Sequence, residues 1–185
     1  MRLVAPVKAP DFDVIDVRGN RIRLSNYRGR RVMLSFFRDA SCPFCNFRCY
    51  ELTHSCKEWR QRGLEIIAFF HSDDADILHY MARYPRPFII IGDPNLEIYV
   101  KYGIERSLWA VLRGTMLHIH RMLRGMTKGP LPRMSADQLL VPADFLIDER
   151  GLIQEVYYGR DIGDHIPITR IRTFIEGGRY ANAAA

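Results

Sequence analysis

The stretch of sequence that decides the fold is Ser41-Cys42-Pro43-Phe44-Cys45, in which two residues separate two cysteines. It follows an apolar run, residues 31–37, that is rich in strand-forming side chains. After it, apolar side chains recur at helical spacing as far as Gly63, a residue type that commonly ends helices. The cysteines are therefore expected where a buried strand gives way to a helix over residues 45–62.

Predicted strands and helices alternate along most of the chain. Residues 13–17 and 21–24, with a turn between them, predict a β-hairpin near the N-terminus. Further strands are predicted at residues 64–70, 88–91, 143–148 and 152–158, and further helices at residues 75–84, 93–102 and 167–176. This alternation requires crossover connections and a mostly parallel centre, to which the last two strands add an antiparallel edge. A Cys-x-x-Cys motif at a strand-to-helix junction of such an α/β chain is typical of the thioredoxin-like fold, a mixed sheet flanked by helices.

The composition is that of a soluble domain with a sizeable core, since 48% of the 185 residues are hydrophobic and 26% are charged. No stretch approaches the ~20 apolar residues of a membrane-spanning helix, and the N-terminus does not match a secretory signal. We expect one thioredoxin-like domain over residues 1–185, with an insertion at about 106–140 and a disordered tail at 178–185. We also expect it in the cytoplasm, where thiols are kept reduced.

The position of the cysteine motif predicts reactive thiols. Backbone N–H groups and the dipole at a helix N-terminus favour a negative sulfur and can lower a thiol pKa to roughly 3.5–7.5. Cys42 is expected at the helix start and Cys45 in the first turn, within disulfide reach of each other. Pro43 suits the first helical position because it has no N–H that needs a partner. The side chain of Arg38 is expected to add positive charge nearby.

All four cysteines lie within residues 42–56, so a local site explains them better than a disulfide scaffold. Four sulfurs could also hold zinc, although structural zinc sites usually take two ligand pairs from separate segments. Cys49 and Cys56 share one face of the predicted helix. They are expected to pack in the core, the alternative being that Cys49 is a third redox thiol.

Further motifs surround the cysteine pair, namely Ala9-Pro10-Asp11-Phe12, Leu24-Ser25-Asn26-Tyr27-Arg28-Gly29, Lys101-Tyr102-Gly103-Ile104 and residues 145–153. In this order and spacing they resemble the alkyl hydroperoxide reductase/thiol-specific antioxidant family, which comprises the peroxiredoxins and their thioredoxin-like relatives. The resemblance covers most of the chain outside residues 106–140, and it is best to a Cys-Pro-x-Cys subgroup called peroxiredoxin-like. It implies a thioredoxin-like fold and a thiol-dependent oxidoreductase.

The resemblance assigns the two cysteines in two ways. In the peroxiredoxin pattern Cys45 holds the peroxidatic place, whereas in the thioredoxin-like pattern Cys42 is the attacking nucleophile. Val141-Pro142 resembles the cis-proline loop that faces the disulfide and holds substrate backbone. Pro142 therefore joins Cys42, Cys45 and Arg38 as a candidate catalytic residue. Asp144, two residues later, lies in a predicted buried strand, where its carboxylate could take a proton from the resolving thiol. The alternative is that Asp144 faces solvent on an edge strand or caps a loop.

Residues 107–126 predict a basic amphipathic helix, because apolar side chains recur at helical spacing and six basic but no acidic residues lie from Arg106 to Arg133. We expect this helix to pack on its own domain or across a homodimer, with a membrane surface or another partner as alternatives. His118 and His120 point to different sides, so a joint metal role is not expected. Nucleic-acid binding is not expected despite the net charge of +6 and pI of about 9.3, because no recognised motif accompanies the charge.

These observations predict an oxidoreductase that cycles Cys42 and Cys45 between dithiol and disulfide while it reduces peroxides or disulfides. No cofactor is expected, because the chain has no glycine-rich dinucleotide fingerprint. Electrons would come from thioredoxin, glutaredoxin or a small thiol. The alternative is a non-enzymatic thioredoxin-fold module whose cysteines bind zinc or sense oxidation. The segment Asp161-Ile162-Gly163-Asp164-His165 is expected to be a turn with a helix cap.

Overall fold

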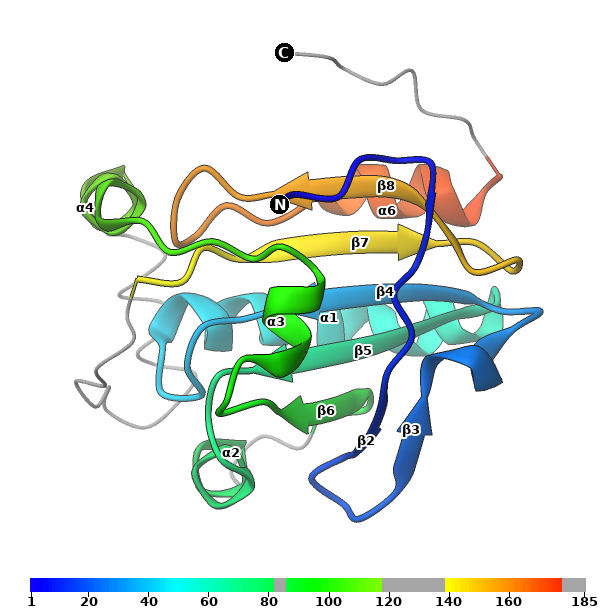
Figure 1. Ribbon diagram of the computed structural model, residues 1–185, viewed down its shortest axis with the longest axis horizontal. Coiled ribbons are helices and arrows are strands. Elements are labelled where there is room, and N and C mark those ends of the chain that lie inside the picture. Colours follow the sequence, from blue (N-terminus) through cyan, green and yellow to red (C-terminus); the bar gives the residue numbers. More distant parts are fainter. Residues whose placement is uncertain (82–85, 118–138, 178–185) are drawn as a thin grey trace.

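The computed structural model describes residues 1–81, 86–117 and 139–177, and a six-stranded mixed sheet forms its centre. Its strands are β1 (Val7–Lys8), β4 (Arg31–Phe36), β5 (Leu64–Phe70), β6 (Ile89–Gly92), β7 (Ala143–Ile147) and β8 (Leu152–Tyr158). Their order is β1-β8-β7-β4-β5-β6 (Figure 1). β4, β5 and β6 pair in parallel, whereas β7 is antiparallel to β4 and β8, and β1 is antiparallel to β8. The mixed α/β architecture agrees with the sequence-based prediction.

The remaining elements flank this sheet on both faces. They are the separate hairpin β2 (Asp13–Ile15) and β3 (Arg21–Arg23), the 3₁₀ helix η1 (Leu24–Tyr27), and the helices α1 (Pro43–Gln61), α2 (Asp74–Met81), α3 (Glu97–Lys101), α4 (Leu108–Leu117) and α6 (Ile168–Ile175). Side chains alternate along β4, so that Met33 packs in the core beneath α1, α2 and α6. Val32 and Leu34 pack in the opposite core, together with α3 and the N-terminal segment (Figure 1).

Most predicted elements are present, and β5 and β8 have the predicted bounds. The two-residue strand β1 was not predicted from the sequence. The predicted helix over residues 93–102 is wrong at its start, since α3 begins only at Glu97. The reason is local: Leu96 adopts a left-handed conformation with a φ of 59°. The carboxylate of Asp93 accepts the N–H groups of Glu97 and Ile98, at 2.9 and 2.8 Å, and so satisfies donors of the first turn.

Part of the predicted basic helix over residues 107–126 is observed as α4. The rest of it, with His118 and His120, lies outside the described residues, as does the predicted tail at 178–185. Within the described residues, no helix has the length and apolar character needed to cross a membrane.

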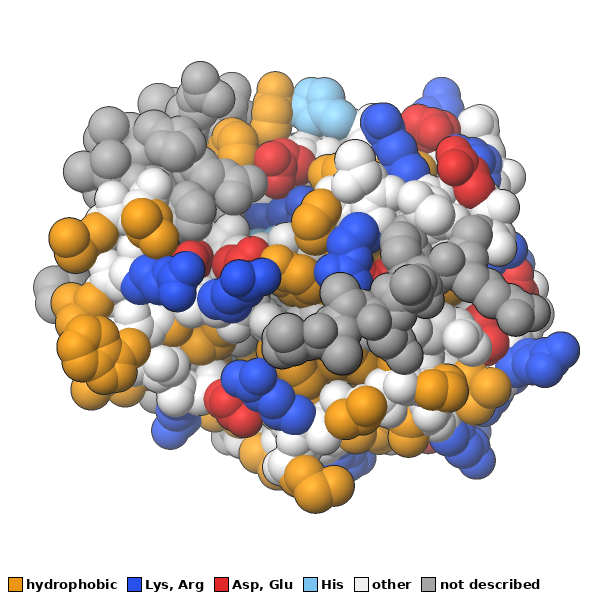
Figure 2. All heavy atoms as spheres, turned by 90° about the horizontal axis from the view of Figure 1, so that it is seen from above, with side chains coloured by type: hydrophobic (Ala, Val, Ile, Leu, Met, Phe, Trp, Pro, Cys, Tyr) orange, Lys and Arg blue, Asp and Glu red, His pale blue; other side chains and the backbone are white. Residues whose placement is uncertain are grey.

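Large apolar side chains are exposed on α4, and hydrophobic side chains gather over this helix in Figure 2. Trp109 has 82% of its surface exposed, and the others are Leu108, Leu112, Met116 and Leu117. The helix lies close to the start of β7, because residues 105–107 bond to residues 139–141 through an Arg106–Leu140 bridge and flanking hydrogen bonds.

Candidate active site

The cysteine motif forms the start of α1, directly beyond the carboxyl end of β4. Cys42 is the N-cap residue, with extended backbone, and Pro43 occupies the first helical position. The carbonyl of Cys42 accepts the N–H of Asn46 at 3.0 Å, which closes the first helical turn. The structure thus places Cys42 at the helix N-terminus and Cys45 within the first turn, as the sequence predicted.

The surroundings of Cys42 and Cys45 shift the pKa values of the two thiols in opposite directions. The pKa of Cys42 is lowered to about 6. The main cause is a hydrogen bond from the Cys45 thiol, and the nearby Arg38 guanidinium and the N–H groups of Cys45 and Phe44 add to it, so that together they outweigh the effect of burial. Nη1 of Arg38 lies 3.8 Å from Sγ of Cys42. The pKa of Cys45 is raised well above its usual value, first by burial and then by the neighbouring Cys42 sulfur. Near neutral pH, Cys42 is therefore held as the thiolate and Cys45 as the thiol.

The loop between β4 and α1 is held by hydrogen bonds that the sequence analysis did not identify. Asp39 accepts the N–H of Ser41 at 2.7 Å through Oδ1 and the hydroxyl of Ser72 at 3.2 Å through Oδ2. The hydroxyl of Ser72 also accepts the N–H of Ala40 at 3.1 Å. Ser72 comes from the segment after β5, so only the parallel pairing of β4 and β5 brings these groups together. These hydrogen bonds join the loop between Arg38, which is 5% exposed, and Cys42 to the segment after β5.

The other two cysteines lie further along α1, and both are buried in the core as predicted. Burial raises the pKa of Cys49 to about 12, and it raises the pKa of Cys56 as well. All four cysteines are free thiols. Among the described residues, no group of three or more His, Cys, Asp or Glu side chains could hold a metal ion, so the zinc alternative finds no support there.

Pro142 lies directly before β7, and its carbonyl accepts the N–H of Gly159 at 2.9 Å. The expectation of a cis peptide before Pro142 is wrong, because the cis bond found in the described residues is Ala5–Pro6. On the other side of this proline, the N–H of Val141 donates to the carbonyl of Glu105 at 3.1 Å. Pro142 therefore lies between the Arg106–Leu140 bridge and β7.

Asp144 is fully buried in β7, an inner strand, as the prediction of a buried strand required, and the alternative of an edge strand facing solvent is wrong. Its carboxylate accepts the Ser35 hydroxyl, the Ile166 N–H at 2.8 Å and a contact from Nδ1 of His165 at 3.1 Å. Burial alone would raise the pKa of Asp144, but His165, Arg48 and Ser35 outweigh it and lower this pKa.

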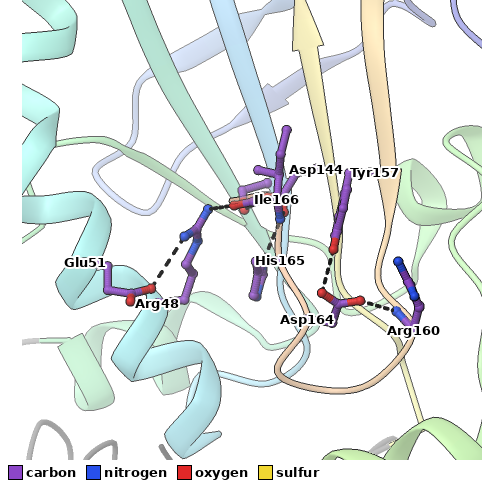
Figure 3. A network of polar contacts seen from close by, with 9 residues as sticks. Arg48, Glu51, Asp144, Tyr157, Arg160, Asp164, His165 and Ile166 are labelled. Atoms are coloured by element: carbon purple, nitrogen blue, oxygen red, sulfur yellow. Dashed lines mark hydrogen bonds and ion pairs between the residues drawn. The ribbon is translucent and has the colours of Figure 1, made fainter. Parts of the chain in front are cut away.

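Arg48 extends this network to α1, as Figure 3 shows. Its Nη2 donates to the carbonyl of Ile166 at 2.7 Å, and its Nη1 lies 3.5 Å from Glu51. The segment 161–165 is a turn, as predicted, but it caps no helix: α6 has Pro167 at its N-cap position and no side-chain cap. Instead, His165 bonds to Asp144, 21 residues earlier, a pairing that no local sequence pattern indicates.

A Cys-x-x-Cys pair at the N-terminus of a helix, next to the central parallel strand of a mixed sheet, defines the thioredoxin-fold class of proteins. Within this class, residues 6–156 match the model of the AhpC/TSA family, and the chain belongs to that family.

Individual relatives are distant. The chain is 24% identical over 111 residues to peroxiredoxin Q, chloroplastic, of Oryza sativa subsp. japonica, a match that covers 60% of this chain and 51% of the relative. It is 22% identical over 110 residues to peroxiredoxin Q, chloroplastic, of Populus jackii, covering 60% and 52%. The chain thus matches about half the length of these curated relatives.

Solved structures share the fold at low sequence identity. Peroxidoxin BcpB from Mycobacterium tuberculosis superposes with a TM-score of 0.60 and 16% identity, covering 83% of this chain and 84% of that one. The reduced 2-Cys peroxiredoxin of Plasmodium vivax gives 0.65 and 14%, covering 91% and 78%. These matches support the thioredoxin-like fold predicted from the sequence.

Proposed function

We propose that this protein is a thiol-dependent oxidoreductase that cycles Cys42 and Cys45 between dithiol and disulfide and reduces peroxides or disulfides. The observation that carries the proposal is the separation of the two thiols at the start of α1. The pKa of Cys42 is lowered and that of Cys45 is raised, so one sulfur is a nucleophile while the other stays protonated beside it.

This separation favours Cys42 as the attacking residue over the peroxiredoxin-like assignment to Cys45. With a disulfide substrate, the Cys42 thiolate attacks one sulfur and forms a mixed disulfide, and the other sulfur leaves as a thiolate. With a hydroperoxide, the Cys42 thiolate attacks the terminal oxygen and the O–O bond breaks. Cys42 becomes a sulfenic acid, and the second oxygen leaves with the electron pair as an alkoxide, or as hydroxide from hydrogen peroxide, and takes up a proton. Cys45 then displaces the leaving thiol or water from Cys42 and closes the Cys42–Cys45 disulfide.

Arg38 and Pro142 complete the proposed site. Arg38 stabilises the Cys42 thiolate and is positioned to do the same for charge that develops during attack. We assign Pro142 to the backbone wall that substrate would contact, an assignment supported by its place directly before β7 and by the family resemblance. Reduction of the disulfide would use thioredoxin, glutaredoxin or a small thiol, and we propose the cytoplasm as the compartment. The exposed apolar side chains of α4 favour a homodimer, which sedimentation or size-exclusion measurements would test.

Peptide mapping by mass spectrometry tests the proposal. Fully reduced protein receives one equivalent of hydrogen peroxide or of a model disulfide for seconds, followed by an alkylating quench. We expect a Cys42–Cys45 disulfide in the wild type, and a sulfenic acid or mixed disulfide at Cys42 in Cys45→Ser.

Three results would change this conclusion. A trapped intermediate on Cys45 in Cys42→Ser, with none on Cys42 in Cys45→Ser, would reverse the assignment. If both thiols stay alkylatable after either oxidant, the redox function should be dropped. A response to the model disulfide alone would restrict the function to disulfide exchange.

A further inference from the structure

One step of the proposed cycle, the deprotonation of Cys45, has no base assigned to it so far. Cys45 must lose its proton before it can attack the Cys42 intermediate. The raised pKa of Cys45 makes this loss of a proton unfavourable near neutral pH. A buried thiol with such a pKa needs a positioned base. The Tyr99 hydroxyl interacts with Cys45 but already donates to the Phe37 and Phe69 carbonyls.

His165 has a buried side chain with one ring nitrogen that has no hydrogen-bond partner in the part of the chain that the structure describes. Its side chain is 4% exposed, and Nδ1 faces the Asp144 carboxylate at 3.1 Å. Because a carboxylate only accepts, this contact assigns the proton of the neutral ring to Nδ1 and leaves the lone pair on Nε2. Nε2 is buried and has no hydrogen-bond partner among residues 1–81, 86–117 and 139–177. A buried nitrogen with a lone pair and no such partner is costly to maintain, so it calls for a functional explanation.

The ring of His165 lies on the side of the sheet that carries the thiols. It packs against Phe37, with ring centroids 5.1 Å apart. The backbone N–H of the next residue, Arg38, is hydrogen-bonded to Cys45 and lowers its pKa. The same two-residue segment thus contacts His165 on one side and Cys45 on the other. Figure 3 shows His165 between α1 and the sheet, with Arg48 of α1 bonded to the adjacent Ile166.

We propose that His165, positioned by Asp144, accepts the proton that Cys45 releases in the second half of the cycle; this inference rests on the proposed function. The Cys45 S–H bond breaks and its proton goes to Nε2 of His165. The sulfur electron pair forms the bond to Cys42 while the bond from Cys42 to the leaving sulfur breaks, and that sulfur departs with its electron pair. The dithiol loses two electrons and the substrate gains them. Asp144 stabilises the imidazolium, which then returns its proton to solvent.

Charged groups of both signs lie around the pair formed by His165 and Asp144, and they affect how the rate of disulfide closure depends on pH. The Asp144 carboxylate faces His165 from β7, with Nδ1 of the ring 3.1 Å from the carboxylate oxygen. Other charges come from the neighbouring loop, β8 and the helices packed nearby, namely Arg48 and Glu51 from α1, Asp164 from the loop, Glu155 from β8 and Arg170 from α6.

A chromogenic aromatic disulfide tests this inference, because it releases one coloured thiolate when Cys42 attacks and a second when Cys45 closes the disulfide. In His165→Asn, the side-chain amide can still donate to Asp144, but no titrating nitrogen remains. We expect the first release to keep its rate and the second to slow by at least about tenfold. The second rate of the wild type should reach a plateau with pH, whereas that of the variant should keep rising as Cys45 itself ionises.

The control is His54→Asn, which changes an exposed histidine on α1 and should leave both releases unaltered. If wild-type protein shows no first release, the proposed function fails. If His165→Asn shows both releases at wild-type rates with a wild-type pH profile, only the present inference fails. Should His165→Asn not fold, the solvent isotope effect on the wild-type second release decides. An effect of about twofold or more on that step alone supports proton transfer to a base, and its absence overturns the inference.

Discussion

The first turn of α1 and its later turns carry the same residue type with opposite chemistry. Cys42 lies at the N-terminus of the helix and has a lowered pKa, whereas Cys49, two turns later, has a pKa raised to about 12. Both side chains are buried, since Cys42 is only 7% exposed and Cys49 is not exposed at all. Burial alone would therefore raise both pKa values.

The difference comes from hydrogen-bond donors and charge. Cys42 receives the Cys45 thiol, two backbone N–H groups and the field of Arg38, because a helix N-terminus leaves its N–H groups free. At Cys49 the backbone donors are used within the helix, and the more distant charges of Arg86 and Arg48 do not offset burial. Position along the helix, not the type of residue, decides which thiol can react.

The largest expected effect is on turnover, which should fall on substitution in the first turn of α1 but not on substitution in its later turns. Cys42→Ser should reduce turnover by about 10³-fold or more, because a neutral hydroxyl replaces the thiolate nucleophile. Cys49→Ala should retain turnover within about twofold, since Cys49 takes no part in the cycle. Steady-state peroxide or disulfide reduction measures both. Comparable losses in the two variants would contradict the division between the first and later turns.

A second effect appears in stability. Cys49→Ser places a hydroxyl in the apolar core and should lower the free energy of unfolding by about 1–3 kcal/mol. Urea unfolding of the reduced protein measures this change. The same substitution at Cys42 should cost less than at Cys49, because donors for an oxygen are already present at the helix N-terminus. Equal decreases in the free energy of unfolding for Cys42→Ser and Cys49→Ser would show that the first turn of α1 stabilises a polar oxygen no better than the core does.

The pH dependence of alkylation sharpens the comparison. The thiolate is the reactive form, so the alkylation rate of Cys42 should rise through a midpoint near its pKa of about 6. Arg38→Gln removes a positive charge, so it should raise this pKa and slow alkylation at pH 6 by up to about tenfold. Lys57→Gln is a matched control, because it removes an exposed positive charge from a later turn of α1. An unchanged midpoint in Arg38→Gln would remove Arg38 from the site.

The last expected effect is on stability at high pH. The folded-state pKa of Cys49 is raised from its ordinary value of 9.0. Below pH 9 the thiol is therefore protonated in both the folded and the unfolded chain, and it does not change the free energy of unfolding with pH. Between pH 9 and 12 the unfolded chain ionises first, so the free energy of unfolding should fall by up to about 1.4 kcal/mol per pH unit from this group. Cys49→Ala should show a shallower fall than the wild type. Parallel curves would mean that Cys49 ionises as easily in the folded state.

Local pattern was enough for much of the fold and for the position of the thiols. The apolar run before Cys42 predicted β4, and Pro43 with the helical spacing after it predicted the start of α1. These features depend on interactions between residues a few positions apart, which a sequence displays directly. The burial of Cys49 and Cys56 was predicted in the same way, from the face of α1 that they share.

The remaining features depend on contacts between distant residues. The register of β4 against β7 places Ser35 opposite Asp144, and the return of the chain after β8 brings His165 to the same carboxylate. The hydrogen bond from Val141 to Glu105, next to Pro142, likewise joins residues far apart in the sequence. No local pattern specifies such pairings, because strand register and loop return are set by packing of the whole core. The sequence by itself therefore determined where a reactive thiol pair lies, and only the tertiary structure decided which polar groups surround it.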